Sequence, residues 1–311
     1  MSNPVQKVVL QRGMHYQMTS ICRVVDEVVR CLDFSHNFHG SVVLLKPNLI
    51  SSRGSALACT HKKFIAGAAA WFLDQGATVR IGDSPAFGTT LSVCRRWGII
   101  EATAGMDIEY VNFSSTVKKK LPAGVTVDIA GEALECDFFI NLSKVKAHNQ
   151  MFVTLATKNI FGIVKGINKA LLHMSYGTSH DRFAGLILDL VKLLPPALHL
   201  ADGITAMHIS GPLSGVPLQL NCIGGSLCPV ALDTALLDVL GLEKSDSPLW
   251  RAASNRKYGG YDIDAIQFPL LSPLDFMNTG FIGPGFLQPV RFNPVRFLGS
   301  LLKRYLVSSR S

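Results

Sequence analysis

The chain has 311 residues, of which 48% are hydrophobic, and its formal net charge is +8 at pH 7. This length and apolar content exclude intrinsic disorder and are typical of an α/β protein whose sheet is covered on both faces. The positive charge favours an anionic partner, but no helix-turn-helix or aromatic RNA-binding pattern accompanies it, so nucleic acid is not expected.

The first half of the chain alternates between predicted strands and helices. A strand over residues 41–48 precedes a helix over 60–77, and a second strand begins at residue 78 and runs into a turn before residue 88. This order predicts a parallel βαβ unit. Further elements follow in this order: a helix over 91–99, strands over 106–113 and 125–131, and a buried strand over 138–142 that ends in a loop.

The second half continues the same alternation up to a different kind of tail. Its predicted elements are an amphipathic helix over 180–196, a strand over 197–204 that leads to a turn, an extended segment over 216–226 and a helix over 228–242. We therefore expect a mostly parallel sheet flanked by helices, in two lobes. The expected divisions are an N-terminal α/β lobe over 1–180, a second α/β portion over 181–270, and a Phe/Pro/Arg-rich tail over 271–311 that ends in a basic helix.

Polar residues gather where these strands are predicted to end. They are Lys46, Asn48, Asp83, Lys144, Lys146, His148 and Asp202. Ligands of open α/β sheets bind outside the carboxyl ends of the strands, so we expect these side chains to line one site, with Lys158 close by. Lysines would hold a carboxylate or phosphate, and His148 would transfer a proton. Singly, Asp83 and Asp202 would more often be helix caps or turn residues.

Several motifs are missing from the sequence. The seven cysteines have no CxxC spacing, which argues against a disulfide framework and leaves no iron–sulfur motif. There is no Walker loop and no G-x-G-x-x-G. No run approaches the roughly 20 apolar residues of a membrane helix, and residues 1–16 lack the apolar core of a signal peptide, so we expect a cytoplasmic protein without a transmembrane segment.

Five segments resemble, in order, the blocks of the domain of unknown function family 362, over about residues 42–242. They are VVLLKPNLI, ATVRIGDSPAFG, DFFINLSKVKAHNQMFVTLATKNIFGIVKG, LADGITAMHISGP and SLCPVALDTALLDVLGL. Many members append a ferredoxin-like segment, which implies redox work and an electron-transfer protein as partner, but this chain lacks that segment. It has Cys228 where the family usually shows Asp, and it retains Asp233, which the resemblance places among the substrate-binding residues.

The stretch from His148 to Lys158 is also similar to a segment of nickel-pincer lactate racemases. The resemblance implies that His148 is catalytic, that Lys158 anchors a cofactor covalently, and that His173 binds nickel. His61 is the candidate for a second catalytic histidine. The residues that flank Lys158 depart from the glycine-rich and Pro-Gly sequence of the racemases.

These observations predict an enzyme of redox or isomerase type that acts on a small anionic metabolite. His148, Lys158 and Lys146 would be catalytic, and a transition metal or a lysine-linked group is the expected kind of cofactor. The alternative is a non-catalytic binding module for a nucleotide or phosphorylated ligand. A third hypothesis is a structural or partner-binding module that uses the basic tail.

Overall fold

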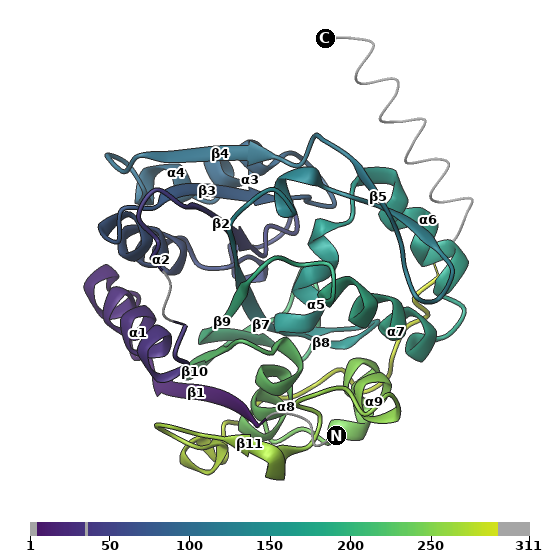
Figure 1. Ribbon diagram of the computed structural model, residues 1–311. Coiled ribbons are helices and arrows are strands. Elements are labelled where there is room, and N and C mark those ends of the chain that lie inside the picture. Colours follow the sequence, from purple (N-terminus) through teal and green to yellow (C-terminus); the bar gives the residue numbers. More distant parts are fainter. Residues whose placement is uncertain (1–4, 35–36, 292–311) are drawn as a thin grey trace.

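The computed structural model describes residues 5–34 and 37–291, and nine strands in this part form one sheet (Figure 1). The strand order is β11–β1–β10–β9–β7–β2–β3–β4, with β8 paired to β7. The strands are β1 (Gln6–Arg12), β2 (Val42–Pro47), β3 (Thr78–Asp83), β4 (Ile108–Asn112), β7 (Phe138–His148), β8 (Phe152–Thr154), β9 (Ala197–His208), β10 (Val216–Ser226) and β11 (Ile266–Gln267). Neighbouring strands from β9 to β4 are parallel, which confirms the predicted mostly parallel α/β sheet.

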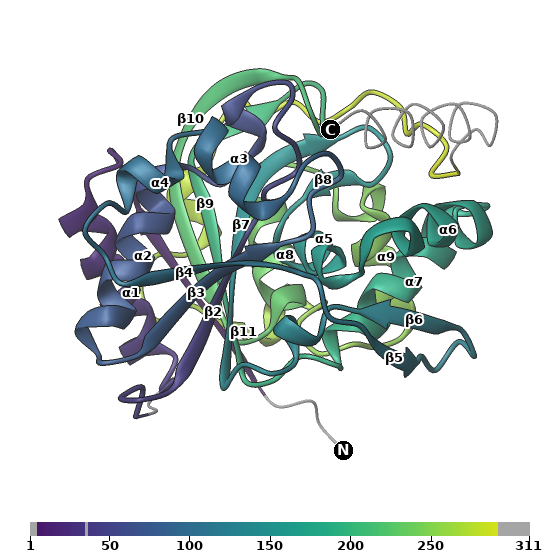
Figure 2. The same cartoon turned by 90° about the horizontal axis from the view of Figure 1, so that it is seen from above.

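Helices cover both faces of this sheet (Figure 2). One face carries α1 (Met18–Cys31), α2 (Lys62–Asp74), α3 (Thr90–Arg96) and α4 (Ile99–Ala102), and the other carries α5 (Ala156–Ile160), α6 (Gly166–Tyr176), α7 (His180–Val191), α8 (Pro229–Val239) and α9 (Pro248–Asn255). Successive side chains of a strand point to opposite faces, so Val43 and Leu45 pack with α1 and α2 whereas Leu44 packs with α7. Burial on both sides explains the near-continuous apolar strands.

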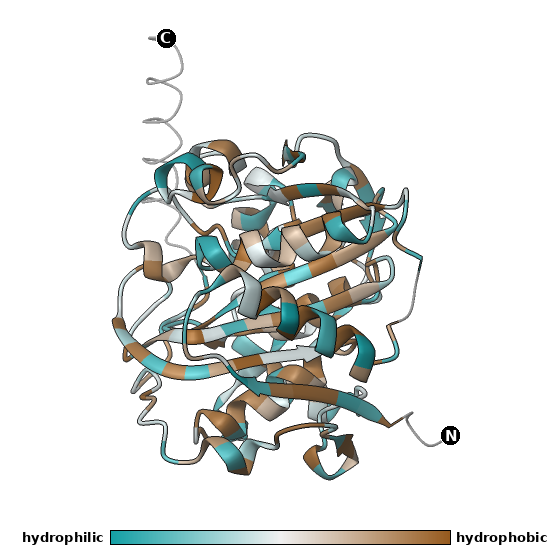
Figure 3. Cartoon of the chain, turned by 90° about the vertical axis from the view of Figure 1, so that its left-hand side faces the viewer, coloured by the Kyte–Doolittle hydropathy of each residue, from teal (hydrophilic) through white to brown (hydrophobic). Residues whose placement is uncertain are grey.

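Helix α1 buries a single stripe, as its spacing predicts, whereas α7 and α8 are buried nearly all round. In α1 the buried residues are Ile21, Val24, Val25, Val28 and Val29, at the three- and four-residue spacing of one helix face. Figure 3 looks onto this side of the molecule and shows mainly apolar strands behind helices that alternate polar and apolar residues. A separate hairpin of β5 (Val117–Lys120) and β6 (Thr126–Ile129) lies outside the main sheet.

Two strands are longer than predicted. The expected loop after Leu142 is wrong, because β7 continues to His148 with every residue buried. The expected turn at Asp202 is also wrong, because β9 runs on to His208 and Asp202 is the register partner of Lys144. The strands continue through these polar residues because the side chains have polar partners inside the protein.

The C-terminal region crosses the end of the β7–β8 hairpin. After a short 3-10 helix at Pro273–Phe276, the chain has no helix or strand up to residue 291, but the Gln288 N–H donates to the Asn149 carbonyl at 2.6 Å. The predicted basic helix falls in residues 292–311, outside the described part. The domain boundaries stay a prediction, although β7 and β9 from the two predicted lobes pair in one sheet. None of the described helices has both the length and the apolar character needed to cross a membrane.

Candidate functional site

A cavity of about 450 Å³ opens where β2, β3 and β7 deliver their polar residues, and α5 and α6 close its other side. The predicted site residues that line it are Lys46, Asn48, Asp83, Lys146, His148, Lys158 and His173. The strand ends and the two helices together bring in residues that lie up to 127 positions apart, from Lys46 on β2 to His173 on α6. This cavity is the candidate functional site.

Lys46 and Asp83 form a buried ion pair on adjacent parallel strands. Their Nζ and Oδ1 atoms are 2.9 Å apart, and the second carboxylate oxygen accepts from the Leu49 N–H at 2.8 Å. Burial lowers the pKa of Lys46, and the negative charge of Asp83 opposes that effect. A Cβ at Gly162 would overlap both side chains, so the backbone of residue 162 forms the wall of the cavity against the pair.

The cavity contains three further lysines. Within the described part of the chain, none of them forms an ion pair with a carboxylate. Lys146 Nζ donates to Asn48 Oδ1 at 2.7 Å and to the carbonyls of Ala58 and Pro212. Lys158 Nζ lies 4.8 Å from the ring centroid of Phe161, and Lys169 donates to the Ser84 carbonyl.

Burial and mutual repulsion perturb all three of these ammonium groups. Burial first, and then neighbouring lysines, lower the pKa of Lys146 and of Lys158 to about 7. Burial likewise lowers the pKa of Lys169 to about 8. With Lys46, the cavity therefore presents four lysines and one carboxylate, Asp83.

Five polar residues that line this cavity were not predicted from the sequence: Ser84, Gln150, Thr154, Asn159 and Lys169. Lys169 lies on α6, in a stretch that reads as the solvated face of a helix, and no local signal separates it from a surface lysine. Asn159 follows Lys158 directly and could have been suspected from that neighbour. It accepts from Asn48 Nδ2 at 2.6 Å and donates to Asn141 Oδ1 at 2.8 Å, which ties α5 to β2 and β7.

Two buried histidines line the same cavity. Nδ1 of His148 accepts hydrogen bonds from the backbone N–H groups of Gln150 at 3.1 Å and Met151 at 3.2 Å. Nδ1 of His173 lies 3.1 Å from the carbonyl oxygen of Val290, in the C-terminal segment. Burial, reinforced by Lys158, lowers the pKa of both imidazoles, that of His173 to about 3. Among the described residues, no three His, Cys, Asp or Glu side chains are grouped so that they could hold a metal ion.

The structure places Lys144 and Asp202 outside the cavity, in a compact polar cluster with Tyr16 and His61. Lys144 Nζ is 2.8 Å from Asp202 Oδ2, and Tyr16 donates to Asp202 Oδ1 at 2.6 Å. His61 begins helix α2 as its N-cap residue and stacks on Tyr16 with ring centroids 3.5 Å apart. This cluster links the segment before α1 and the start of α2 to β7 and β9.

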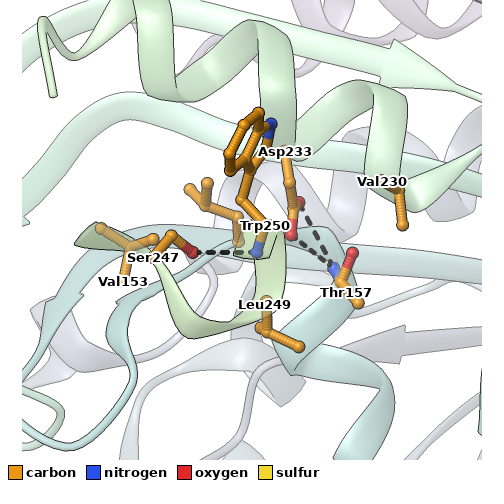
Figure 4. A pocket seen from close by; sticks show the side chains of 8 residues that line it. Val153, Thr157, Val230, Asp233, Ser247, Leu249 and Trp250 are labelled. Atoms are coloured by element: carbon orange, nitrogen blue, oxygen red, sulfur yellow. Dashed lines mark hydrogen bonds between the residues drawn. The ribbon is translucent and has the colours of Figure 1, made fainter. Parts of the chain in front are cut away.

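Asp233 also lies elsewhere, at the N-terminus of α5 (Figure 4). Its Oδ1 atom accepts from the Ala156 N–H at 2.7 Å, and both carboxylate oxygens face the Thr157 N–H. Burial raises the pKa of Asp233 to about 7. Because α5 carries Lys158 and Asn159, Asp233 supports the wall of the cavity from behind.

The fold and the site define an α/β protein with a buried, lysine-rich cavity at the carboxyl end of a mostly parallel sheet. The chain belongs to the DUF362 family, a domain of unknown function, whose model matches residues 43–238. The predicted family resemblance is thereby confirmed.

A similar relative is the thylakoid-associated protein sll1697 of Synechocystis, which is 31% identical over 277 residues. The aligned region covers 88% of this chain and 86% of that relative. Among solved structures, the lactate racemase apoprotein of Thermoanaerobacterium thermosaccharolyticum aligns over 74% of this chain with a TM-score of 0.48 and 12% identity. A protein of Thermotoga maritima aligns over 70% with a TM-score of 0.44 and 12% identity. The chain spans 57% of each of these two solved chains.

Proposed function

We propose that the protein is an enzyme that binds a small metabolite with two or more negative charges in the lysine-lined cavity. The observation that carries this proposal is the charge imbalance of Lys46, Lys146, Lys158 and Lys169 against the single carboxylate of Asp83. Lys146 is fully buried, and Lys158 and Lys169 are half-buried. Such ammonium groups without a carboxylate destabilise a protein, and an anion that enters the cavity would relieve that cost. The volume of about 450 Å³ suits a metabolite rather than a polymer.

The same groups support chemistry as well as binding. Lysines whose pKa lies at about 7 exchange protons readily near neutral pH, unlike an exposed lysine. Lys146 and Lys158 are therefore the proposed proton-transferring groups in a reaction of isomerase or redox type. Lys46, Asn48 and Lys169 are the proposed anchors of the anion.

Lys158 and His173 are compatible with a lysine-linked cofactor that carries its own transition metal. Such a group needs a nucleophilic amine without an ion-pair partner, and Lys158 is such an amine within the described part of the chain. Lys158 would hold the group, and His173 would be the imidazole placed to bind its metal, which would supply a hydride acceptor. Intact mass of protein from its native host, compared with a Lys158→Ala variant, tests this assignment.

Calorimetric titration with simple anions at constant ionic strength tests the proposed binding. We expect malonate and pyrophosphate to bind more tightly than acetate, because each brings more negative charge into the lysine-lined cavity. The matched variant is Lys7→Met, which removes an exposed lysine of the same chain and should leave binding unchanged. Equal, negligible binding of all three anions would refute the proposal.

Turnover separates the enzyme from the alternative of a non-catalytic binding module. Protein prepared from its native host is incubated in D2O with a panel of carboxylates, including 2-hydroxy acids, and exchange at carbon is followed by proton NMR. We expect exchange in at least one substrate and its loss in Lys158→Ala. Tight anion binding without exchange or any other conversion would favour the binding module.

A further inference from the structure

The two cavity histidines differ in which ring nitrogen carries the proton. An N–H group can only donate, so the two backbone amides that point at His148 Nδ1 require a lone pair on that atom. The single proton of the neutral ring must then sit on Nε2. A flipped ring would turn a C–H group toward both amides, so the hydrogen bonds also fix the orientation of the ring.

His173 has the opposite arrangement. The Val290 carbonyl oxygen can only accept, so His173 Nδ1 must carry the proton and Nε2 must carry the lone pair. The backbone therefore imposes opposite tautomers on two imidazoles that line one cavity. The β7–β8 hairpin fixes His148, whereas the C-terminal segment fixes His173.

We propose, resting on the anion-binding function above, that His148 is a fixed hydrogen-bond donor that gives its Nε2–H to an oxygen of the bound anion. This assignment differs from the proton acceptor that the sequence predicted. To accept a proton at Nε2, the ring would have to move its own proton to Nδ1, where two N–H groups already point. His148 therefore recognises ligand oxygen and polarises it, while proton transfer falls to the lysines.

The tautomers are measured first, without any ligand. Protein with ¹⁵N-labelled histidine gives long-range ¹H–¹⁵N correlations that distinguish protonated from unprotonated ring nitrogens, and His148→Asn and His173→Asn variants assign the two rings. We expect a protonated Nε2 in His148 and a protonated Nδ1 in His173. A protonated Nδ1 in His148, or a mixture of both tautomers, would overturn the proposal.

A pair of substitutions then separates donation to the ligand from support of the hairpin turn. His148→Asn keeps a side-chain acceptor for the turn but has no group at the position of Nε2, whereas His148→Gln keeps an amide N–H near that position. We expect His148→Asn to weaken malonate binding about tenfold to a hundredfold, with the hairpin amide shifts preserved, and His148→Gln to recover part of the loss. Wild-type affinity in both variants would overturn donation.

The two proposals fail in different ways. If wild-type protein binds neither malonate nor pyrophosphate, the proposed function is refuted and donation to an anion falls with it, although the spectrum still decides the tautomers. If wild-type protein binds malonate but His148 carries its proton on Nδ1, only the present inference is refuted. Both measurements use the full chain.

Discussion

Strand β7 carries two buried lysines, two residues apart, in opposite electrostatic situations. Lys144 is paired with Asp202 at 2.8 Å and lies beside Tyr16 in a cluster that joins helices to the sheet. Lys146 faces the cavity, where only an amide oxygen and carbonyl oxygens accept from it, and its pKa falls to about 7. A buried charge can thus be compensated within the fold, as that of Lys144 is, or left without a carboxylate, as that of Lys146 is, and the second case is the one that the proposed anion would compensate.

The largest expected effect comes from breaking the compensated pair. Lys144→Met leaves the buried Asp202 carboxylate without its cation and should lower the free energy of unfolding by about 3–5 kcal/mol. Urea unfolding measures the change. The double variant Lys144→Met/Asp202→Asn is the control, because it removes both charges and should recover most of the loss; a loss as large as that of the single variant would contradict a stabilising ion pair.

The same substitution two residues later should act in the opposite direction. Lys146→Met removes a buried ammonium group that has no carboxylate, so it should raise the free energy of unfolding by about 1–2 kcal/mol. The stabilised variant should bind malonate more weakly than wild type in calorimetric titration. Destabilisation by Lys146→Met as large as that by Lys144→Met would abolish the distinction between the two lysines.

The pH dependence of stability should report the cavity lysines. Their folded-state pKa values of about 7 lie below the unfolded value, so above pH 7 the unfolded chain holds more protons and stability rises with pH. Each such lysine contributes up to about 1.4 kcal/mol per pH unit. Urea unfolding between pH 7.5 and 9 should therefore show a shallower slope for Lys158→Met than for wild type. An unchanged slope would mean that Lys158 titrates as an exposed lysine does.

The smallest expected effect is at Asp233, a buried carboxylate with no ion pair in the described residues. Asn at this position still offers an oxygen to the α5 amides, so Asp233→Asn should cost less than about 1 kcal/mol at pH 5. Burial raises the pKa of Asp233 to about 7, so the wild type loses stability as pH rises from 4 to 7. This loss, about 1.4 kcal/mol per pH unit, affects the wild type but not the variant, so urea unfolding should show Asp233→Asn as the more stable protein by pH 8. A wild type that remained the more stable protein at pH 8 would indicate that the ionised carboxylate is the better cap.

The sequence predicts the strand cores well, because apolar runs such as 138–142 can only be buried. It predicts strand ends poorly, because a lysine that finds a partner inside the protein looks the same as a lysine in a loop. Lys144 is the example, since its partner Asp202 lies 58 positions away on β9. Lys146 and His148, in contrast, were predicted as site residues and do line the cavity.

Two residues on helices show what local patterns could not predict. Lys169 reaches the cavity because α6 is placed over the strand ends, and that placement depends on contacts with α7 rather than on the residues around Lys169. Asp233 shows the reverse case, in which a residue chosen for the ligand instead caps the helix behind the cavity. Local patterns identify residue types suited to a site, whereas packing decides which of them meet.

The lowered pKa of the cavity lysines couples ligand binding to the buffer. An anion held against Lys146 and Lys158 would raise their pKa again, so at pH 8 the complex would take up protons from solution as it forms. The apparent binding enthalpy would then depend on the ionisation heat of the buffer, and affinity would decline as the solution becomes more alkaline. The protein would behave as a receptor for an anion together with its protons.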